Sequence, residues 1–211
     1  MARPRNITDE RLIAAAGVVI SRLGPGFTLA DVAAEARVSV GTVAQRFGSK
    51  HGLLVAMTRG GIDGMRGRLR GPSDGPGGSN GGNGGNGGNG GGNGGDPVSA
   101  TIRAIVDAYA PLDDPATAAN NLAQLAGDLA DPELRLLMAE FYSVMEDELA
   151  ALVAGAIEAG ALPGAPPAAQ AARILAALAD GAAVHWSARP EGALGDRLRA
   201  DLSAVLGGWR T

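Results

Sequence analysis

A tract rich in glycine and asparagine at residues 71–97 divides the chain into two parts. It holds 15 of the 34 glycines, and five asparagines follow at positions 80, 83, 86, 89 and 93. The tract has no apolar side chain whose burial would offset the entropy lost on ordering, so we expect it to be disordered. We therefore predict a domain at 1–70, a flexible linker at 71–97 and a second domain at 98–211.

The two flanking parts carry opposite net charges. Residues 1–70 hold 11 Lys and Arg against 5 acids, net +6, whereas residues 98–211 hold 7 Arg against 15 acids, net −8. The total of −4 hides this division. The asymmetry favours an anionic partner for the first part alone.

The composition excludes several classes of protein. The chain has no cysteine, and its only two histidines, His51 and His185, lie far apart, so we expect no metal site and no cofactor. No segment approaches the ~18 consecutive apolar residues of a membrane helix, and we expect a cytoplasmic protein. No nucleophile–base pair is visible, so we do not expect an enzyme.

Both parts are expected to be entirely helical, which gives an all-α fold. Thr8, Thr28 and Ser39 are predicted N-caps, and Asp131-Pro132 is the strongest helix start in the second part. The predicted helices cover residues 9–23, 29–36, 40–47, about 50 onward, 97–110, 115–129, 132–159, about 167–187 and about 191–209.

Residues 28–47 have the pattern of a helix-turn-helix, in which the second helix lies in the DNA major groove. Ala33 and Ala36 are small enough for the two short helices to approach closely. The hydroxyls and amides at Thr28 and Ser39 are suited to phosphate contacts at helix N-termini. The basic first part is therefore predicted to bind DNA.

Three spaced motifs carry a resemblance to a known family: TLADVA at residues 28–33, VSVGTV at 38–43 and FGSK at 47–50. Together they resemble the DNA-binding domain of TetR-family transcriptional regulators, over about residues 8–57. Segments in the second part, including DPELR at 131–135, resemble recurring stretches of the family's ligand and dimerisation domain.

The resemblance implies a homodimer that binds double-stranded operator DNA through its third helix and a small-molecule effector through its second part. It places the dimer interface on the last two helices, at about 167–187 and 191–209. The function that the resemblance implies is a repressor released from a near-palindromic operator by its effector. The alternative is a helical effector-binding or protein-interaction protein whose degenerate helix-turn-helix no longer binds DNA.

The chain departs from the family pattern at three positions of the helix-turn-helix. Arg37 replaces the usual glycine of the turn, so either it adopts a left-handed conformation at some cost or the turn differs. Val40 stands where a basic residue or proline is common, and Ala44 replaces an aromatic residue that usually touches the DNA backbone.

The candidate DNA contacts have a competing structural role in most cases. The hydroxyl residues also serve as helix caps, and the charged residues also suit a solvated surface. Glutamine suits adenine and arginine suits guanine in the major groove. The candidates are Thr28, Ser39, Val40, Gly41, Thr42, Gln45, Arg46 and Lys50.

The large side chains of the second part are candidates for an effector pocket. Aromatic residues and methionines at helical spacing belong to a core more often than to a pocket, so both roles remain open. The candidates are Tyr109, Met138, Phe141, Tyr142, Met145, His185 and Trp186. Because a flexible linker cannot transmit a displacement, we expect coupling to pass through packing of the fourth helix on the second part.

Overall fold

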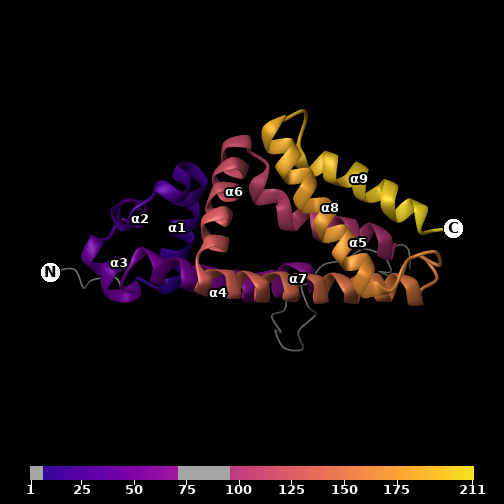
Figure 1. Ribbon diagram of the computed structural model, residues 1–211, viewed down its shortest axis with the longest axis horizontal. Coiled ribbons are helices and arrows are strands. Elements are labelled where there is room, and N and C mark those ends of the chain that lie inside the picture. Colours follow the sequence, from indigo (N-terminus) through magenta and orange to yellow (C-terminus); the bar gives the residue numbers. More distant parts are fainter. Residues whose placement is uncertain (1–6, 71–95) are drawn as a thin grey trace, which may run out of the picture.

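The computed structural model describes the backbone of residues 7–70 and 96–211, with side chains for 7–65 and 96–211. These residues form nine α-helices and two short 3-10 turns, with no strand among them (Figure 1). The predicted all-α class is confirmed. Residues 71–95 of the predicted linker lie outside the described residues, whereas Asp96 and Pro97 already form the start of a helix.

Three short helices build the N-terminal end of the molecule: α1 (Asp9–Leu23), α2 (Leu29–Ala36) and α3 (Val40–Phe47). The predicted caps are present, since the side chains of Thr8, Thr28 and Ser39 each accept a hydrogen bond from a backbone N–H of the following turn. A 3-10 turn, Gly24–Gly26, separates α1 from α2. The shared core includes Leu12, Phe27, Val32 and Val43, all essentially inaccessible to solvent.

Helix α4 (Lys50–Arg70) leaves this end of the molecule and packs along the longest helix, α7 (Pro132–Glu158). Leu53 near its start belongs to the N-terminal core, and Met65 belongs to the core of the C-terminal part. One continuous helix therefore takes part in both cores.

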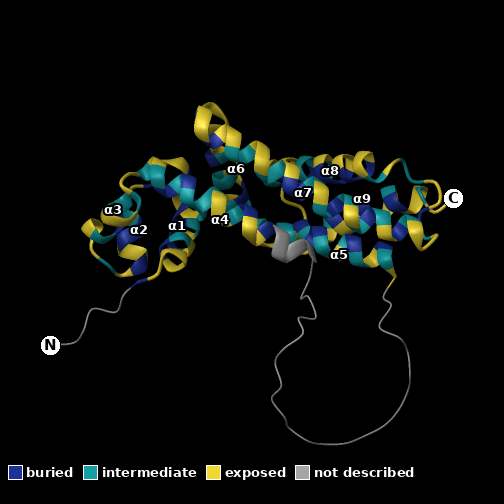
Figure 2. Cartoon of the chain, turned by 90° about the horizontal axis from the view of Figure 1, so that it is seen from below, coloured by how far each residue is buried: buried dark blue, intermediate teal, exposed yellow. Residues whose placement is uncertain are grey.

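The C-terminal part consists of α5 (Pro97–Tyr109), α6 (Pro115–Ala130), α7, α8 (Ala168–Ala188) and α9 (Leu194–Gly208), with a 3-10 turn at Ala110–Leu112. Alanines of α8 and leucines of α9 lie in its core (Figure 2). Helix α6 also packs against α1, so this part contacts the N-terminal end directly as well as through α4.

The last helix begins at Leu194, three residues later than the sequence predicted. Gly192 has a φ of +67°, which interrupts a right-handed helix. The Asp113 carboxylate accepts a 2.7 Å hydrogen bond from the Leu194 amide and takes the place of a local cap. This helix start therefore depends on a residue 81 positions away.

Arg37 ends α2 in the left-handed conformation, with φ 57° and ψ 50°. It is the one non-glycine residue with positive φ in the described parts of the chain. Its amide donates to the carbonyls of the preceding turn, which makes it the C-cap of α2. The first of the two possibilities for this turn is confirmed.

Replacing Arg37 with glycine should raise the free energy of unfolding by roughly 0.5–1 kcal/mol. A non-glycine side chain in the left-handed conformation costs about 1–2 kcal/mol, which glycine avoids. Glycine also loses more backbone entropy on folding, and this loss cancels part of the stabilisation. Urea denaturation measures the effect. Arg37→Ala removes the same charge but keeps the Cβ, so equal stabilisation by alanine would show that charge, not backbone strain, is responsible.

Candidate DNA-binding face and effector cavity

The outer face of α3 presents several of the predicted DNA contacts. Val43 is fully buried against the N-terminal core and fixes the rotation of the helix. Val40, Gly41 and Gln45 consequently lie on the exposed side, where the Val40 side chain is 45% exposed. These three residues form a continuous surface near the start of α3.

The predicted hydroxyl contacts are engaged in local caps. Thr28 and Asp31 form a complete capping box: the Asp31 amide donates to Thr28 Oγ1 at 3.3 Å, and the Thr28 amide donates to Asp31 Oδ2 at 2.7 Å. Ser39 Oγ accepts from the Thr42 amide at 3.2 Å and lies 2.9 Å from Thr42 Oγ1. Thr28 and Ser39 remain exposed and Thr42 is partly exposed, so each has a local role and a solvent-facing side.

The two predicted cations beside α3 are held by protein groups. Arg46 Nη1 lies 2.6 Å from Asp9 Oδ1, and Arg46 Nη2 donates to the Ile7 carbonyl at 3.2 Å. Lys50 Nζ donates to the carbonyls of Pro25 and Phe27 at 2.6 and 2.8 Å. The same ammonium lies 4.2 Å from the centre of the Phe27 ring. Both side chains thus hold the neighbouring segments that they contact in place beside the helix-turn-helix.

Arg37 is a cation that sequence reasoning considered only for its backbone. It is exposed at the turn between α2 and α3, and it makes no hydrogen bond or ion pair through its side chain with any described residue. Arg11 and Arg22, by contrast, bind the Ala36 carbonyl and Glu35. The sequence signal for Arg37 was its position beside the predicted recognition helix.

Two polar contacts join the N-terminal end to the C-terminal part. His51 Nε2 lies 3.0 Å from Glu133 Oε2, and His51 Nδ1 lies 3.5 Å from Asp131 Oδ2. The Asn120 side-chain amide donates to the Ser21 carbonyl at 2.9 Å. The sequence alone does not indicate these partners of His51, because they lie 80 or more positions away.

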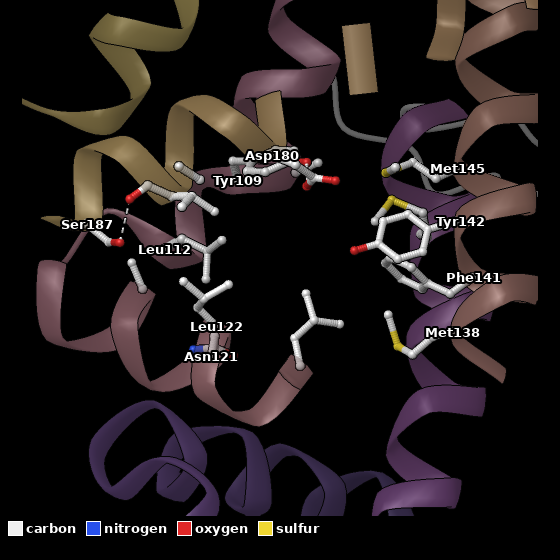
Figure 3. Close-up of a pocket in the computed structure, with 16 residues that line it drawn as sticks. Tyr109, Leu112, Asn121, Leu122, Met138, Phe141, Tyr142, Met145, Asp180 and Ser187 are labelled. Carbon is white, nitrogen blue, oxygen red and sulfur yellow. Dashed lines mark hydrogen bonds between the residues drawn. The ribbon is translucent and has the colours of Figure 1, made fainter. Parts of the chain in front are cut away.

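A cavity of about 400 Å³ lies between α5, α6, α7 and α8 (Figure 3). Its size is within the usual range for small-molecule sites, about 300–1,000 Å³. Five predicted pocket residues line it: Tyr109, Met138, Phe141, Tyr142 and Met145. Phe141 and Tyr142 meet edge to face, with ring centres 5.7 Å apart.

The structure does not bring His185 and Trp186 into this cavity. Helix α8 faces it through Asp180, Ala183, Val184 and Ser187, which follow helical spacing. His185 therefore points to solvent on another side of the helix. Trp186 is 2% exposed in the core, where its indole N–H donates to the Gly192 carbonyl at 3.1 Å.

Asp180 gives the cavity its charge, and sequence reasoning missed it. Tyr109 donates a short hydrogen bond to Asp180 Oδ1. Burial raises the pKa of Asp180, and this hydrogen bond opposes the rise. Burial, and then the negative charge of Asp180, raise the pKa of both Tyr109 and Tyr142. The sequence offers one indication of this role: Asp180 is the only acidic residue in the alanine-rich run 174–184.

Two family models match the chain. Residues 98–208 match the C-terminal domain of BetI-type transcriptional repressors. Residues 12–57 match the bacterial regulatory proteins of the tetR family. No curated protein matches the chain in sequence.

Solved structures of regulators share the fold over nearly the whole chain. A transcriptional regulator from Rhodococcus sp. Rha1 is 24% identical, with 97% of this chain and 99% of that chain covered and a TM-score of 0.69. SmeT, the repressor of the Stenotrophomonas maltophilia multidrug efflux pump SmeDEF, is 19% identical, with 97% and 91% covered and a TM-score of 0.64. A regulator from Saccharomonospora viridis in complex with choline is 19% identical, with 94% and 95% covered and a TM-score of 0.66.

The His51 contact predicts a pH dependence. The hydrogen bond to the Glu133 carboxylate raises the pKa of His51 above its ordinary value of 6.5, and the charge of Asp131 adds to the rise. Because the folded-state pKa is raised, the contact should stabilise the protein fully below pH 6.5 and lose this effect as pH rises through the folded-state pKa. Glu133→Gln should lower the pKa of His51, measured by NMR titration.

Glu140→Gln is the matched control, since it removes the same charge from an exposed position of α7. An equal fall in the His51 pKa in both variants would mean that the general field of α7, not the Glu133 contact, is responsible.

Proposed function

The chain belongs to the TetR family of bacterial transcriptional regulators, and we propose that it is a dimeric repressor released from its operator by a small-molecule effector. The proposal assigns DNA binding to residues 1–70 and effector binding and dimerisation to residues 98–211, with residues 71–97 as the linker. It acts by binding and not by catalysis. One observation carries the proposal. A capped helix-turn-helix is joined by α4 to the C-terminal part, which contains a cavity large enough for a small molecule.

In the proposed complex, the outer face of α3 enters the major groove. Gln45 is the candidate for a base contact, while Val40 and Gly41 lie against the groove. The N-termini of α2 and α3, at Thr28 and Ser39, would approach phosphates, with Thr42 beside them. A two-fold dimer places two such helices on one duplex, which favours a near-palindromic operator.

Arg46 and Lys50 are proposed to act mainly by positioning. Each would have to leave protein acceptors at hydrogen-bond distance before its charged group could bind a phosphate closely. Arg37 has no such competing contact with described residues, which supports it as an added phosphate contact.

The alternative is a helical effector-binding or protein-interaction protein that does not bind DNA. The observation in its favour is the apolar, 45% exposed Val40 side chain at the start of α3. A small Ala44 on the same helix removes a further backbone contact expected from the family resemblance. DNA binding by the purified protein distinguishes the two functions.

Gly41→Glu should lower affinity for DNA from upstream of the protein's own gene at least about tenfold, a change of ~1.4 kcal/mol. The new carboxylate would stand on the exposed face of α3 and repel phosphates. There is room for it, because a Cβ at Gly41 meets only Ser39 Oγ, at 3.7 Å. A mobility-shift titration at several salt concentrations measures both affinity and the number of phosphate contacts.

Ala14→Glu is the control for this measurement, because it adds the same charge at an exposed position of α1. Equal loss in both variants would indicate a general charge effect. Absence of any specific complex with the unaltered protein at low salt would favour the alternative function.

We also propose that α8 and α9 form the dimer interface. The outer side of α8 exposes Ile174, Ala177 and, at the edge next to the effector cavity, Val184, with Gly181 on the same stripe. A Cβ at Gly181 would meet no described atom within 4 Å, so packing within the described parts of one protomer does not require a glycine there. An apolar stripe with a small residue at its centre suits close approach of a partner helix.

Ile174→Glu should weaken the dimer about a hundredfold, measured by sedimentation equilibrium. Loss of a buried isoleucine side chain costs about 1.5–3 kcal/mol, and a buried unpaired carboxylate adds to this. Leu136→Glu is the control, since Leu136 on α7 is 73% exposed and lies outside the proposed interface. An unchanged dimer in Ile174→Glu would contradict the assignment of α8.

A further inference from the structure

A second cavity lies where the N-terminal helices meet the C-terminal part. Its volume is about 250 Å³, and its walls come from α1, α4, α6 and α7. Ile20 and Met57 line it on the N-terminal side, while Gln124, Asp128 and Phe141 line it on the other. This junction cavity therefore touches both parts of the molecule.

Gln124 and Asp128 bring a buried, hydrogen-bonded polar pair to the junction cavity. The residue is only 8% exposed, and its Nε2 donates to Asp128 Oδ1 at 2.7 Å. Its Oε1 is buried and has no hydrogen-bond partner among the described residues. The opposite amide orientation would set Oε1 against the Asp128 carboxylate, so Asp128 fixes the orientation seen. Because Oε1 has essentially no accessible surface, the Asp128 carboxylate is the acceptor that this pair offers to a ligand in the cavity.

The junction cavity adjoins the effector cavity. Four residues, Asn121, Leu125, Met138 and Phe141, line both. Asp180 stands in the effector cavity, and Gln124 with Asp128 stands in the junction cavity. The residues between these acceptors are largely apolar. No described lysine, arginine or histidine lines either cavity.

We propose that the two cavities together bind one elongated organic cation of the α,ω-diamine type. One ammonium group binds Asp180, the second binds the Asp128 carboxylate beside Gln124, and the apolar chain passes Met138 and Phe141. This inference rests on the proposed effector-regulated function and names the class of ligand for that site.

The charges and surfaces of the joined site match this class. An ammonium group carries three N–H donors and no acceptor, which complements the carboxylate at each end of the joined site. The ring faces of Tyr142 and Phe141 can also attract a nearby ammonium group through cation–π interactions. A dicarboxylate would meet Asp180 and Asp128 as like charges. Burial raises the pKa of Asp128 as it does that of Asp180, and a bound cation would oppose both shifts.

Occupation of the junction cavity also offers a route to regulation. The end of the ligand beside Gln124 would lie against Ile20 of α1 and Met57 of α4. Both helices belong to the N-terminal core that holds the helix-turn-helix. A ligand that extends into this cavity thus changes the packing between the two parts, whereas a shorter ligand fills the effector cavity alone.

The test is calorimetric titration of the full-length protein with linear α,ω-diamines of increasing chain length. Each diamine is compared with the monoamine and the dicarboxylate of the same length. At the best length, the diamine should bind at least about tenfold more tightly than the monoamine, and the dicarboxylate should not compete. Equal binding of diamine and monoamine at every length, or tighter binding of the dicarboxylate, would overturn the proposal.

Two substitutions locate the ends of the ligand. Asp128→Asn should reduce diamine affinity to that of the monoamine and leave monoamine affinity unchanged, while Asp180→Asn should weaken both. Gln124→Met, which removes the amide that binds Asp128, provides a second variant at the junction end if Asp128→Asn does not fold, as judged by circular dichroism. Glu140→Gln, on the exposed side of α7, is the control and should bind as the unaltered protein does. Unchanged diamine affinity in a folded junction variant would overturn the proposal.

The same preparations are tested in the DNA mobility-shift assay. Specific DNA binding without diamine binding would overturn the ligand class and leave the regulator intact. Diamine binding that follows the pattern above, without specific DNA binding, would support the ligand class and contradict the proposed function.

Discussion

Helix α4 supplies residues to two different cores, and this double anchoring determines how the parts of the molecule are joined. Leu53 packs with α1, α2 and α3, and Met65 packs with the C-terminal helices. Met65 lies 12 positions after Leu53, a rise of about 18 Å at 1.5 Å per residue. Phe141 of α7 approaches closely enough that a Cβ at Gly61 would lie 4.0 Å from its ring. A displacement of α7 near the effector cavity therefore acts directly on a helix of the N-terminal core.

Charge in the N-terminal part serves structure as well as partner binding. The net +6 of residues 1–70 suggested a freely available basic surface. Yet Arg46 pairs with Asp9, and Lys50 binds the Pro25 and Phe27 carbonyls. Exposed ion pairs are worth little in stability, so these contacts hold geometry more than they add free energy. Net charge predicts long-range attraction of an anionic partner, while the residues that touch it depend on which cations remain unengaged.

The sequence predicted features governed by nearby residues and missed those governed by distant ones. Capping signals placed Thr8, Thr28 and Ser39 correctly because cap and helix lie within one turn. The start of α9 was misplaced because its cap comes from Asp113. Their size and helical spacing made Met138, Phe141, Tyr142 and Met145 candidates for a core or a pocket, and all four line the cavity. Asp180 and Gln124 could not be assigned, since their role follows from how α6 and α8 pack on α7.

The predicted linker does not by itself require the two parts to act separately. Met65 lines the effector cavity and lies on α4, before the glycine-rich tract begins. A ligand in that cavity would therefore contact the helix that carries the N-terminal core without any signal passing along residues 71–95. Asn120 and His51 add contacts between the parts at two other places, on α6 with α1 and on α4 with α7. The fold can accommodate a long linker between α4 and α5, because the contacts that join the two parts are formed by residues on either side of it.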